Sequence, residues 1–111
     1  MSNWSALVGA ALYLALTTGP AGAQTPEANA QRGRQLAERL CTNCHAVGAQ
    51  LPSVVKPDVP SFAAIARRPE VSAERLAGAI IIPHPAMPGI QLTTAEIRDI
   101  VTYILSMKPQ K

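Results

Sequence analysis

The sequence predicts an all-α fold in one small domain. Apolar side chains recur at helical spacing in the segments 29–40 and 93–107. No segment shows the strict alternation of apolar and polar residues that is typical of a half-buried strand. A chain of 111 residues has room for a single domain.

The N-terminal segment has the features of a secretory signal peptide. No charged side chain precedes Glu27, and the apolar run Ala6–Leu16 is followed by the small residues Ala21 and Ala23. An apolar run of this length with an A-x-A-like ending is typical of an export signal. We therefore expect residues 1–23 to be cleaved after Ala23, leaving an exported, periplasmic domain of residues 24–111.

The alternative is a membrane anchor that stays uncleaved. A membrane-spanning helix needs about 20 apolar residues. The run approaches that length only if Thr17, Thr18, Gly19 and Pro20 are counted in it. Gly19 and Pro20 suit a cleavage region better than a membrane-spanning helix, so no stable membrane insertion is expected after cleavage.

Composition argues against a nucleic-acid-binding protein. The formal net charge is +3, and the basic residues are scattered singly instead of forming a basic face. Phe62 and Tyr103 are the only aromatic residues after the predicted signal. Domains this small often need a metal, disulfides or a cofactor for stability, so a bound group is expected to fill the interior.

The first and last helices of the domain are the clearest. The segment 29–40 begins at the potential N-cap Asn29 and contains Gly33, which costs about 1 kcal/mol against Ala and so implies close packing. Thr93 and Glu96 form a capping-box pattern at the start of the last helix. Its apolar face contains Ile97, Ile100, Val101, Ile104 and Leu105.

Two shorter helices are expected between them. Ser61 can cap one that stops at Pro69, and Ser72 can cap another that ends at Pro83. The segments 46–60 and 81–92 each carry three prolines and are expected to be loops.

The sequence "CTNCH", Cys41–His45, carries the chemistry. A disulfide between Cys41 and Cys44 would close a very small loop, and a thioredoxin-like dithiol would need strands that the pattern lacks. A structural zinc site needs four protein ligands, and the chain offers only these two cysteines, His45 and His84.

C-x-x-C-H is also the signature of covalent haem attachment. Thiols three positions apart lie about one helical turn from each other, so each can reach one of two neighbouring vinyl groups. The following residue, His45, can then ligate the iron. Export, helical content and an underfilled core favour this interpretation, with one haem c attached through Cys41 and Cys44.

The sixth iron ligand is expected from the proline-rich loop. Met87 stands between Pro85 and Pro88, and a thioether opposite a histidine is a known haem ligand. His84 in the same loop is the competitor, and an open sixth site is a further alternative. Met107 continues the last helix and is expected to pack in the core.

Together these residues resemble the class I cytochromes c, especially small exported bacterial ones, over residues 29–107. The resemblance rests on a helix leading into C-T-N-C-H, the A-M-P-G loop and a long last helix containing "DIVTYI". It implies that the N- and C-terminal helices cross, with Gly33 on one side and Tyr103 on the other. It also implies that the carbonyl of Pro60 accepts a hydrogen bond from Nδ1–H of His45.

The function implied is that of a periplasmic one-electron carrier and not of an enzyme, since no catalytic acid, base or nucleophile stands out. His45 and Met87 would ligate the iron, a periplasmic dehydrogenase would donate electrons and a membrane oxidase or similar complex would accept them. A monomer is expected. The alternatives are an electron-accepting subunit of one dehydrogenase, and a ligand-binding haem protein with an open or His84-ligated site.

Electrostatic steering of partners is expected to be weak. The chain has only three lysines, and two ionised haem propionates would lower its formal charge of +3 to about +1.

Overall fold

The computed structural model describes residues 28–48, 56–82, 84 and 87–110. These residues form four helices and no strand, which confirms the all-α prediction: α1 (Ala30–Leu40), α2 (Phe62–Ala66), α3 (Ala73–Ile81) and α4 (Thr94–Ser106). In this described part, no helix is long and apolar enough to cross a membrane. The predicted signal peptide, residues 1–23, lies outside the described residues.

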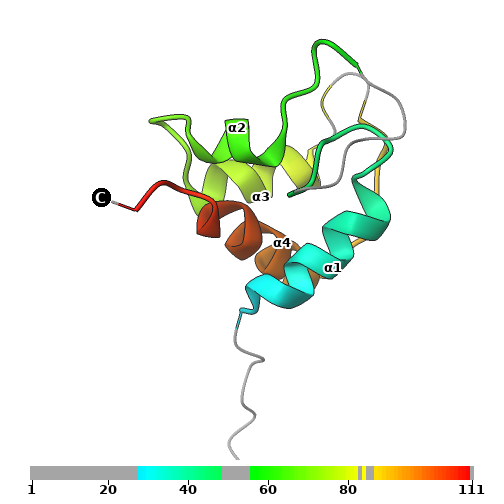
Figure 1. Ribbon diagram of the computed structural model, residues 1–111. Coiled ribbons are helices and arrows are strands. Elements are labelled where there is room, and N and C mark those ends of the chain that lie inside the picture. The colour runs from blue at the N-terminus through cyan, green and yellow to red at the C-terminus, as the bar shows by residue number, and fades with distance from the viewer. Residues whose placement is uncertain (1–27, 49–55, 83, 85–86, 111) are drawn as a thin grey trace, which may run out of the picture.

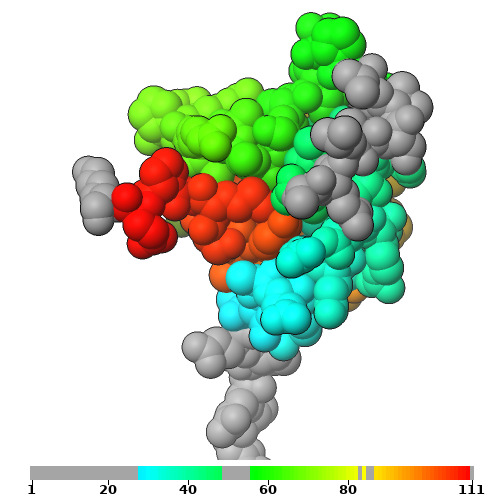
Figure 2. All heavy atoms as spheres, viewed as in Figure 1, coloured from blue at the N-terminus to red at the C-terminus, as the bar shows by residue number. Residues whose placement is uncertain are grey.

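Helix α4 is the centre of the fold. Each of the other three helices packs against it, and α1 crosses it most closely (Figure 1). In the space-filling view, the end of α4 (orange to red) lies between α1 (cyan) and the α2–α3 side (green to yellow-green) (Figure 2). The buried core draws on every helix: Leu36, Ala37, Val47, Phe62, Ala66, Leu76, Ile100, Val101 and Ile104.

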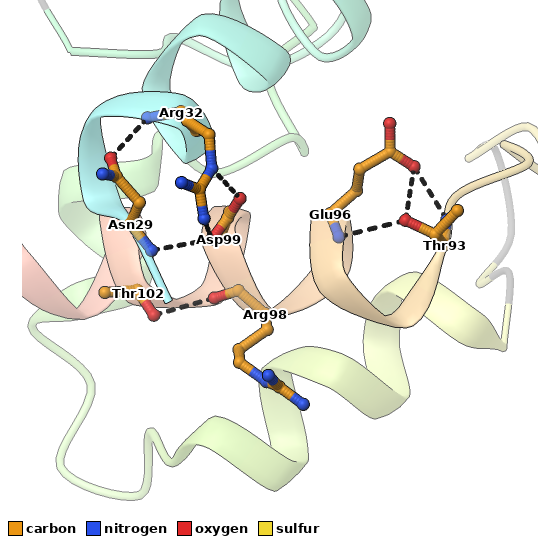
Figure 3. A network of polar contacts seen from close by, with 7 residues as sticks. All are labelled: Asn29, Arg32, Thr93, Glu96, Arg98, Asp99 and Thr102. Atoms are coloured by element: carbon orange, nitrogen blue, oxygen red, sulfur yellow. Dashed lines mark hydrogen bonds and ion pairs between the residues drawn. The ribbon is translucent and has the colours of Figure 1, made fainter. Parts of the chain in front are cut away.

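The predicted helix starts are all confirmed. The side chains of Asn29, Ser61 and Ser72 each accept a hydrogen bond from the backbone N–H three residues later. At the start of α4, the Thr93 hydroxyl accepts from the N–H of Glu96, and the Glu96 carboxylate accepts from the N–H of Thr93 (Figure 3). These bonds satisfy backbone donors that a helix leaves without intrahelical partners.

The predicted end of α2 is wrong by two residues. The helix ends at Ala66, with Arg67 as C-cap, instead of reaching Pro69. Arg68 still donates its N–H to the carbonyl of Ile65 in a turn. A residue that precedes proline is disfavoured in the α conformation, so Arg68 cannot continue the helix.

Gly33 lies at the contact between α1 and α4. A Cβ atom there would overlap the backbone carbonyl of Asp99 and come within 2.8 Å of the backbone nitrogen of Ile100. The crossing predicted from the resemblance is therefore present. However, backbone atoms lie directly opposite Gly33, whereas Tyr103 lies one helical turn further along α4, with its ring centroid 6.3 Å from that of Phe62.

A buried carboxylate joins the start of α1 to α4. Asp99 is only 4% exposed and accepts hydrogen bonds from the backbone N–H of Asn29 at 2.7 Å and from Nε of Arg32 at 2.8 Å (Figure 3). The Arg32 guanidinium holds the pKa of this carboxyl below its usual range, and the Asn29 N–H adds to the effect. The amphipathic pattern did not predict that this acidic residue is buried.

Candidate cofactor site

A tight turn at the end of α1 places the two cysteines and His45. The N–H of Cys41 closes the helix by donating to the carbonyl of Ala37. The carbonyl of Cys41 then accepts from the N–H groups of Cys44 at 3.1 Å and His45 at 2.8 Å. Two hydrogen bonds to one carbonyl hold the motif in a single compact turn. The sequence motif is thus also a structural unit that continues directly from α1.

The imidazole of His45 is held on both sides. Its Nδ1 lies 2.8 Å from the carbonyl oxygen of Pro60, which confirms the contact implied by the resemblance. The ring of Phe62 packs against it, with centroids 5.5 Å apart. The backbone N–H of Phe62 donates to the carbonyl of Ala46, so the segment after His45 is tied to the start of α2. With Nδ1 engaged, Nε2 is the nitrogen left for a metal.

An apolar hollow opens beside this imidazole. We call it the inner hollow, and His45 and Met87 both line it. The other lining residues come from the turn, from α2 to α4 and from the loop before α4: Cys41, Phe62, Ile65, Leu76, Ala79, Ile80, His84, Ile90, Leu92, Ile100 and Ile104. Cys44 lines an adjoining hollow together with Cys41, His45, His84 and Met87.

The two cysteines do not have the properties of a redox dithiol. No disulfide joins Cys41 and Cys44. Burial raises the pKa of the Cys41 thiol to about 11, and the neighbouring Cys44 adds to the shift. Reactive dithiols depend on a lowered pKa that favours the thiolate, so this environment argues against the thioredoxin-like interpretation.

A zinc site has no support in the described part of the chain either. No group of three or more His, Cys, Asp or Glu side chains in residues 28–48, 56–82, 84 and 87–110 is arranged to hold a metal ion. Cys44 instead lies near a cation, with Nζ of Lys56 3.6 Å from its sulfur.

Both candidates for the sixth ligand lie at the hollow. The N–H of Met87 donates to the carbonyl of His84 at 3.0 Å, and both residues line the inner hollow. Met87 is half-buried and His84 is exposed. Met107 follows the end of α4 and packs against the core, as predicted.

These residues fit a haem. The two adjoining hollows together offer an apolar lining for a flat macrocycle, two thiols at attachment spacing, an imidazole nitrogen and a thioether sulfur. Bound haem would supply reversible one-electron chemistry at its iron.

Comparison with known proteins gives the same result. Residues 28–104 match the family described as cytochrome c oxidase, cbb3-type, subunit III. The chain is also 44% identical over 103 residues to cytochrome c-552 of Bradyrhizobium diazoefficiens, covering 93% of this chain and 96% of that protein. No solved structure matches. The chain therefore belongs to this family of c-type cytochromes, electron-transfer proteins that carry covalently bound haem c, and its Cys41-Thr-Asn-Cys44-His45 sequence is the haem-binding motif.

Proposed function

We propose that this cytochrome is a periplasmic one-electron carrier with histidine–methionine ligation of its haem iron. Cys41 and Cys44 hold the haem, while His45 and Met87 are its axial ligands. The observation that carries the proposal is that His45 and Met87 line one apolar hollow although 42 positions separate them in the sequence.

The surroundings of His45 suit a ligand that stays bound through both oxidation states. A histidine whose Nδ1–H donates to a carbonyl, here that of Pro60, has a fixed tautomer and ring orientation and a more basic Nε2. Phe62 restricts rotation of the ring further. Little movement is then needed when an electron arrives or leaves.

The Met87 side of the hollow favours the reduced state. A methionine sulfur is a soft ligand that raises the reduction potential relative to harder ligands. Ile80, Ile90 and Leu92 line the inner hollow with apolar side chains. An apolar shell limits water access and lowers the local dielectric constant, which disfavours the extra positive charge of the ferric state.

The proposed location and partners follow from the N-terminal segment and the family. Residues 1–23 have the pattern of an export signal, which supports a periplasmic location, and the proposed electron donor is a periplasmic dehydrogenase. The family description names a subunit of an oxidase, which supports a membrane oxidase or a similar complex as acceptor. The exported protein should begin at Gln24, as N-terminal sequencing or intact mass can determine; retention of residues 1–23 in the membrane would contradict this part of the proposal.

The axial ligands are tested by absorption spectroscopy of the oxidised protein. Ferric haem with a methionine ligand has a sulfur-to-iron charge-transfer band, which we expect in the wild type and in His84→Ala but not in Met87→Ala. The His84 variant is a matched control because His84 lines the same hollow as Met87. A band that disappears in His84→Ala and persists in Met87→Ala would refute the assignment.

A second candidate function is favoured by His84, which lines the same hollow as Met87. If Met87 does not bind the iron, the protein has an open or His84-ligated site and could react with a small ligand. Carbon monoxide distinguishes these functions, since it should bind the ferrous protein readily at an open site and poorly when Met87 is bound. A fixed dehydrogenase subunit would instead co-purify with its dehydrogenase in constant ratio.

A further inference from the structure

We propose that Tyr103 donates an electron through Phe62 and His45 when a hydroperoxide oxidises the haem, so that the oxidising equivalent leaves the cofactor site. We call these three side chains the aromatic path. The inference adds a protective function to electron carriage, with hydrogen peroxide as the oxidant. It rests on the proposed ligation of the iron by His45.

The aromatic path is a continuous set of ring contacts. The ring centroids of His45 and Phe62 lie 5.5 Å apart, and those of Phe62 and Tyr103 lie 6.3 Å apart. Both pairs are tilted, at 54° and 56°, and aromatic rings at such separations and tilts interact directly. Electron tunnelling weakens steeply as the gap between two groups grows. Two short steps therefore connect Tyr103 to the proposed iron ligand.

The rings of the path are held by separate segments of the chain. Nδ1 of His45 lies 2.8 Å from the carbonyl oxygen of Pro60. Phe62 begins α2, is only 4% exposed and donates its N–H to the carbonyl of Ala46. Tyr103 belongs to α4, the helix against which the other three pack. The spacing of the rings is therefore built into the fold.

Tyr103 ends the path near the molecular surface. The residue is half-buried, and its hydroxyl oxygen lies 2.7 Å from the position that a Cβ atom would take at Gly48. Gly48 is exposed and has a positive φ of 61°. A radical on this phenol is within reach of small molecules in solution, whereas the ring of Phe62 is enclosed in the core.

The surroundings of the phenol suit release of its proton on oxidation. Burial raises the pKa of Tyr103, while the positive charge of Arg34 opposes the shift and the negative charge of Glu38 adds to it. The phenol thus stays protonated at neutral pH and loses its proton when it loses an electron. Arg34 and Glu38 form an ion pair, with Nε and Oε1 2.7 Å apart. The carboxylate of this pair, or water, accepts the proton.

The step balances when the carrier starts in its reduced state. Hydrogen peroxide takes up two electrons and two protons to become two water molecules. One electron comes from ferrous iron, which becomes ferric, and the other comes from Tyr103 together with its proton; solvent supplies the remaining proton. The neutral phenoxyl returns to phenol when a small reductant, such as a thiol or ascorbate, supplies one electron and one proton.

The sequence leaves Tyr103 as the one phenol of the exported domain. Trp4 and Tyr13, the other easily oxidised aromatic residues, lie in the predicted signal peptide. Without an exit, the oxidising equivalent would fall on groups beside the haem, such as the thioether of Met87, which oxidises to the sulfoxide. A phenol is much harder to oxidise than ferrous haem, so Tyr103 takes no part in the ordinary carrier cycle.

The proposal is tested by mixing the reduced, haem-loaded protein with hydrogen peroxide in the presence of a nitroso spin trap. The trap bonds to tyrosyl radicals, and mass spectrometry of peptides identifies the residue that carries the adduct. We expect the adduct on Tyr103. Tyr103→Phe, which keeps the ring, should form no adduct. It should also oxidise twice as many ferrous haems per peroxide, because both electrons must then come from iron, and lose its haem absorbance faster in excess peroxide.

Further variants separate transfer along the path from attack by a diffusing oxidant. Phe62→Leu interrupts the path and retains Tyr103, so most of the adduct should be lost. Tyr103→Phe/Gln35→Tyr moves the phenol to an exposed position of α1, away from the haem site, where it should stay unlabelled. Met87→Ala should react faster and give the same adduct, because a bound methionine slows access of peroxide to the iron. Circular dichroism and haem spectra check that each variant is folded.

Each opposite result contradicts the inference. Peroxide consumption without an adduct on Tyr103, equal labelling of the tyrosine introduced at position 35, or an undiminished adduct in folded Phe62→Leu would show that the path carries no electrons. If neither the wild type nor Met87→Ala consumes peroxide, the protective function is absent. The carrier proposal is judged separately, from the sulfur-to-iron band of the oxidised protein before peroxide is added, so the two proposals can fail independently.

Discussion

Nδ1 of His45 lies 2.8 Å from the carbonyl oxygen of Pro60, so a residue 15 positions away determines how the haem-motif imidazole is oriented. The pyrrolidine ring restricts the backbone at residue 60 and helps to keep that carbonyl in place. Phe62 extends the same support from the first turn of α2.

We therefore expect Pro60→Ala to raise the reduction potential. In the proposed ligation, a more mobile carbonyl would make His45 a less basic ligand, and a less basic ligand stabilises ferric iron less. Pro57→Ala is the matched control, because Pro57 is an exposed proline of the same loop. Potentiometric titration of the three proteins measures the effect; equal potentials for Pro60→Ala and the wild type would contradict it.

Gly33→Ala should destabilise the protein strongly. The added methyl would overlap the backbone of Asp99, which cannot move without separating α1 from α4. Overpacking of this kind typically costs 1–3 kcal/mol or more, so we expect a loss of at least about 2 kcal/mol in the free energy of unfolding.

Gly78→Ala is the control for helix propensity. Gly78 lies within α3 with nothing within 4 Å of an added Cβ, so Gly78→Ala should raise the free energy of unfolding of the protein by about 0.5–1 kcal/mol. Denaturant unfolding of both variants separates the two effects. Equal losses in the free energy of unfolding for Gly33→Ala and Gly78→Ala would contradict the close packing assigned to Gly33.

Asp99→Asn should weaken the attachment of the start of α1 to α4. The amide oxygen of this variant could still accept from the N–H of Asn29 and from Nη2 of Arg32, as Oδ1 does now. The NH₂ group that replaces Oδ2 cannot accept from Nε of Arg32, and losing one such hydrogen bond costs about 0.5–1.5 kcal/mol. Glu38→Gln, which alters the more exposed Arg34–Glu38 pair, should cost no more than about 0.5 kcal/mol.

The effect of Asp99 should depend on pH in a defined direction. Its pKa is lower in the folded than in the unfolded protein, so its contribution is complete above the unfolded value of about 3.9. It is lost as pH falls through the lower folded pKa. The stability difference between wild type and Asp99→Asn should thus be largest near neutral pH and shrink below about pH 4; a difference that grows on acidification would contradict this.

Thr93→Ala should fray the start of α4. The change removes the hydroxyl that accepts from the N–H of Glu96, and loss of such a cap costs about 0.5–2 kcal/mol. Hydrogen exchange should be faster in the first turn of α4, whereas α1 should exchange at its wild-type rate unless the protein unfolds globally. Uniform acceleration in all helices would show that the cap has no local effect.

Features that depend on local interactions could be predicted from the sequence. The starts of all four helices are caps in which a side chain bonds to backbone within three residues, so Asn29, Ser61, Ser72 and Thr93 carry that information themselves. The haem motif is equally local, because its spacing alone brings two thiols and an imidazole to one turn. The contact between His45 and Pro60 was reached only through the resemblance to a family.

Other features are decided by contacts between distant segments. The burial of Asp99 depends on Asn29 and Arg32, about 70 positions earlier, so no pattern within α4 could reveal it. Likewise the exposure of Ile81 and Ile82 at the end of α3 depends on which other segments pack there, and their hydropathy does not reveal it. The sequence alone thus determined the helices, their starts and the cofactor, because these depend on neighbours along the chain. Only the tertiary structure decided which carboxylate is buried, what lies opposite Gly33 and which apolar side chains remain in water, because burial is set by residues that folding brings together.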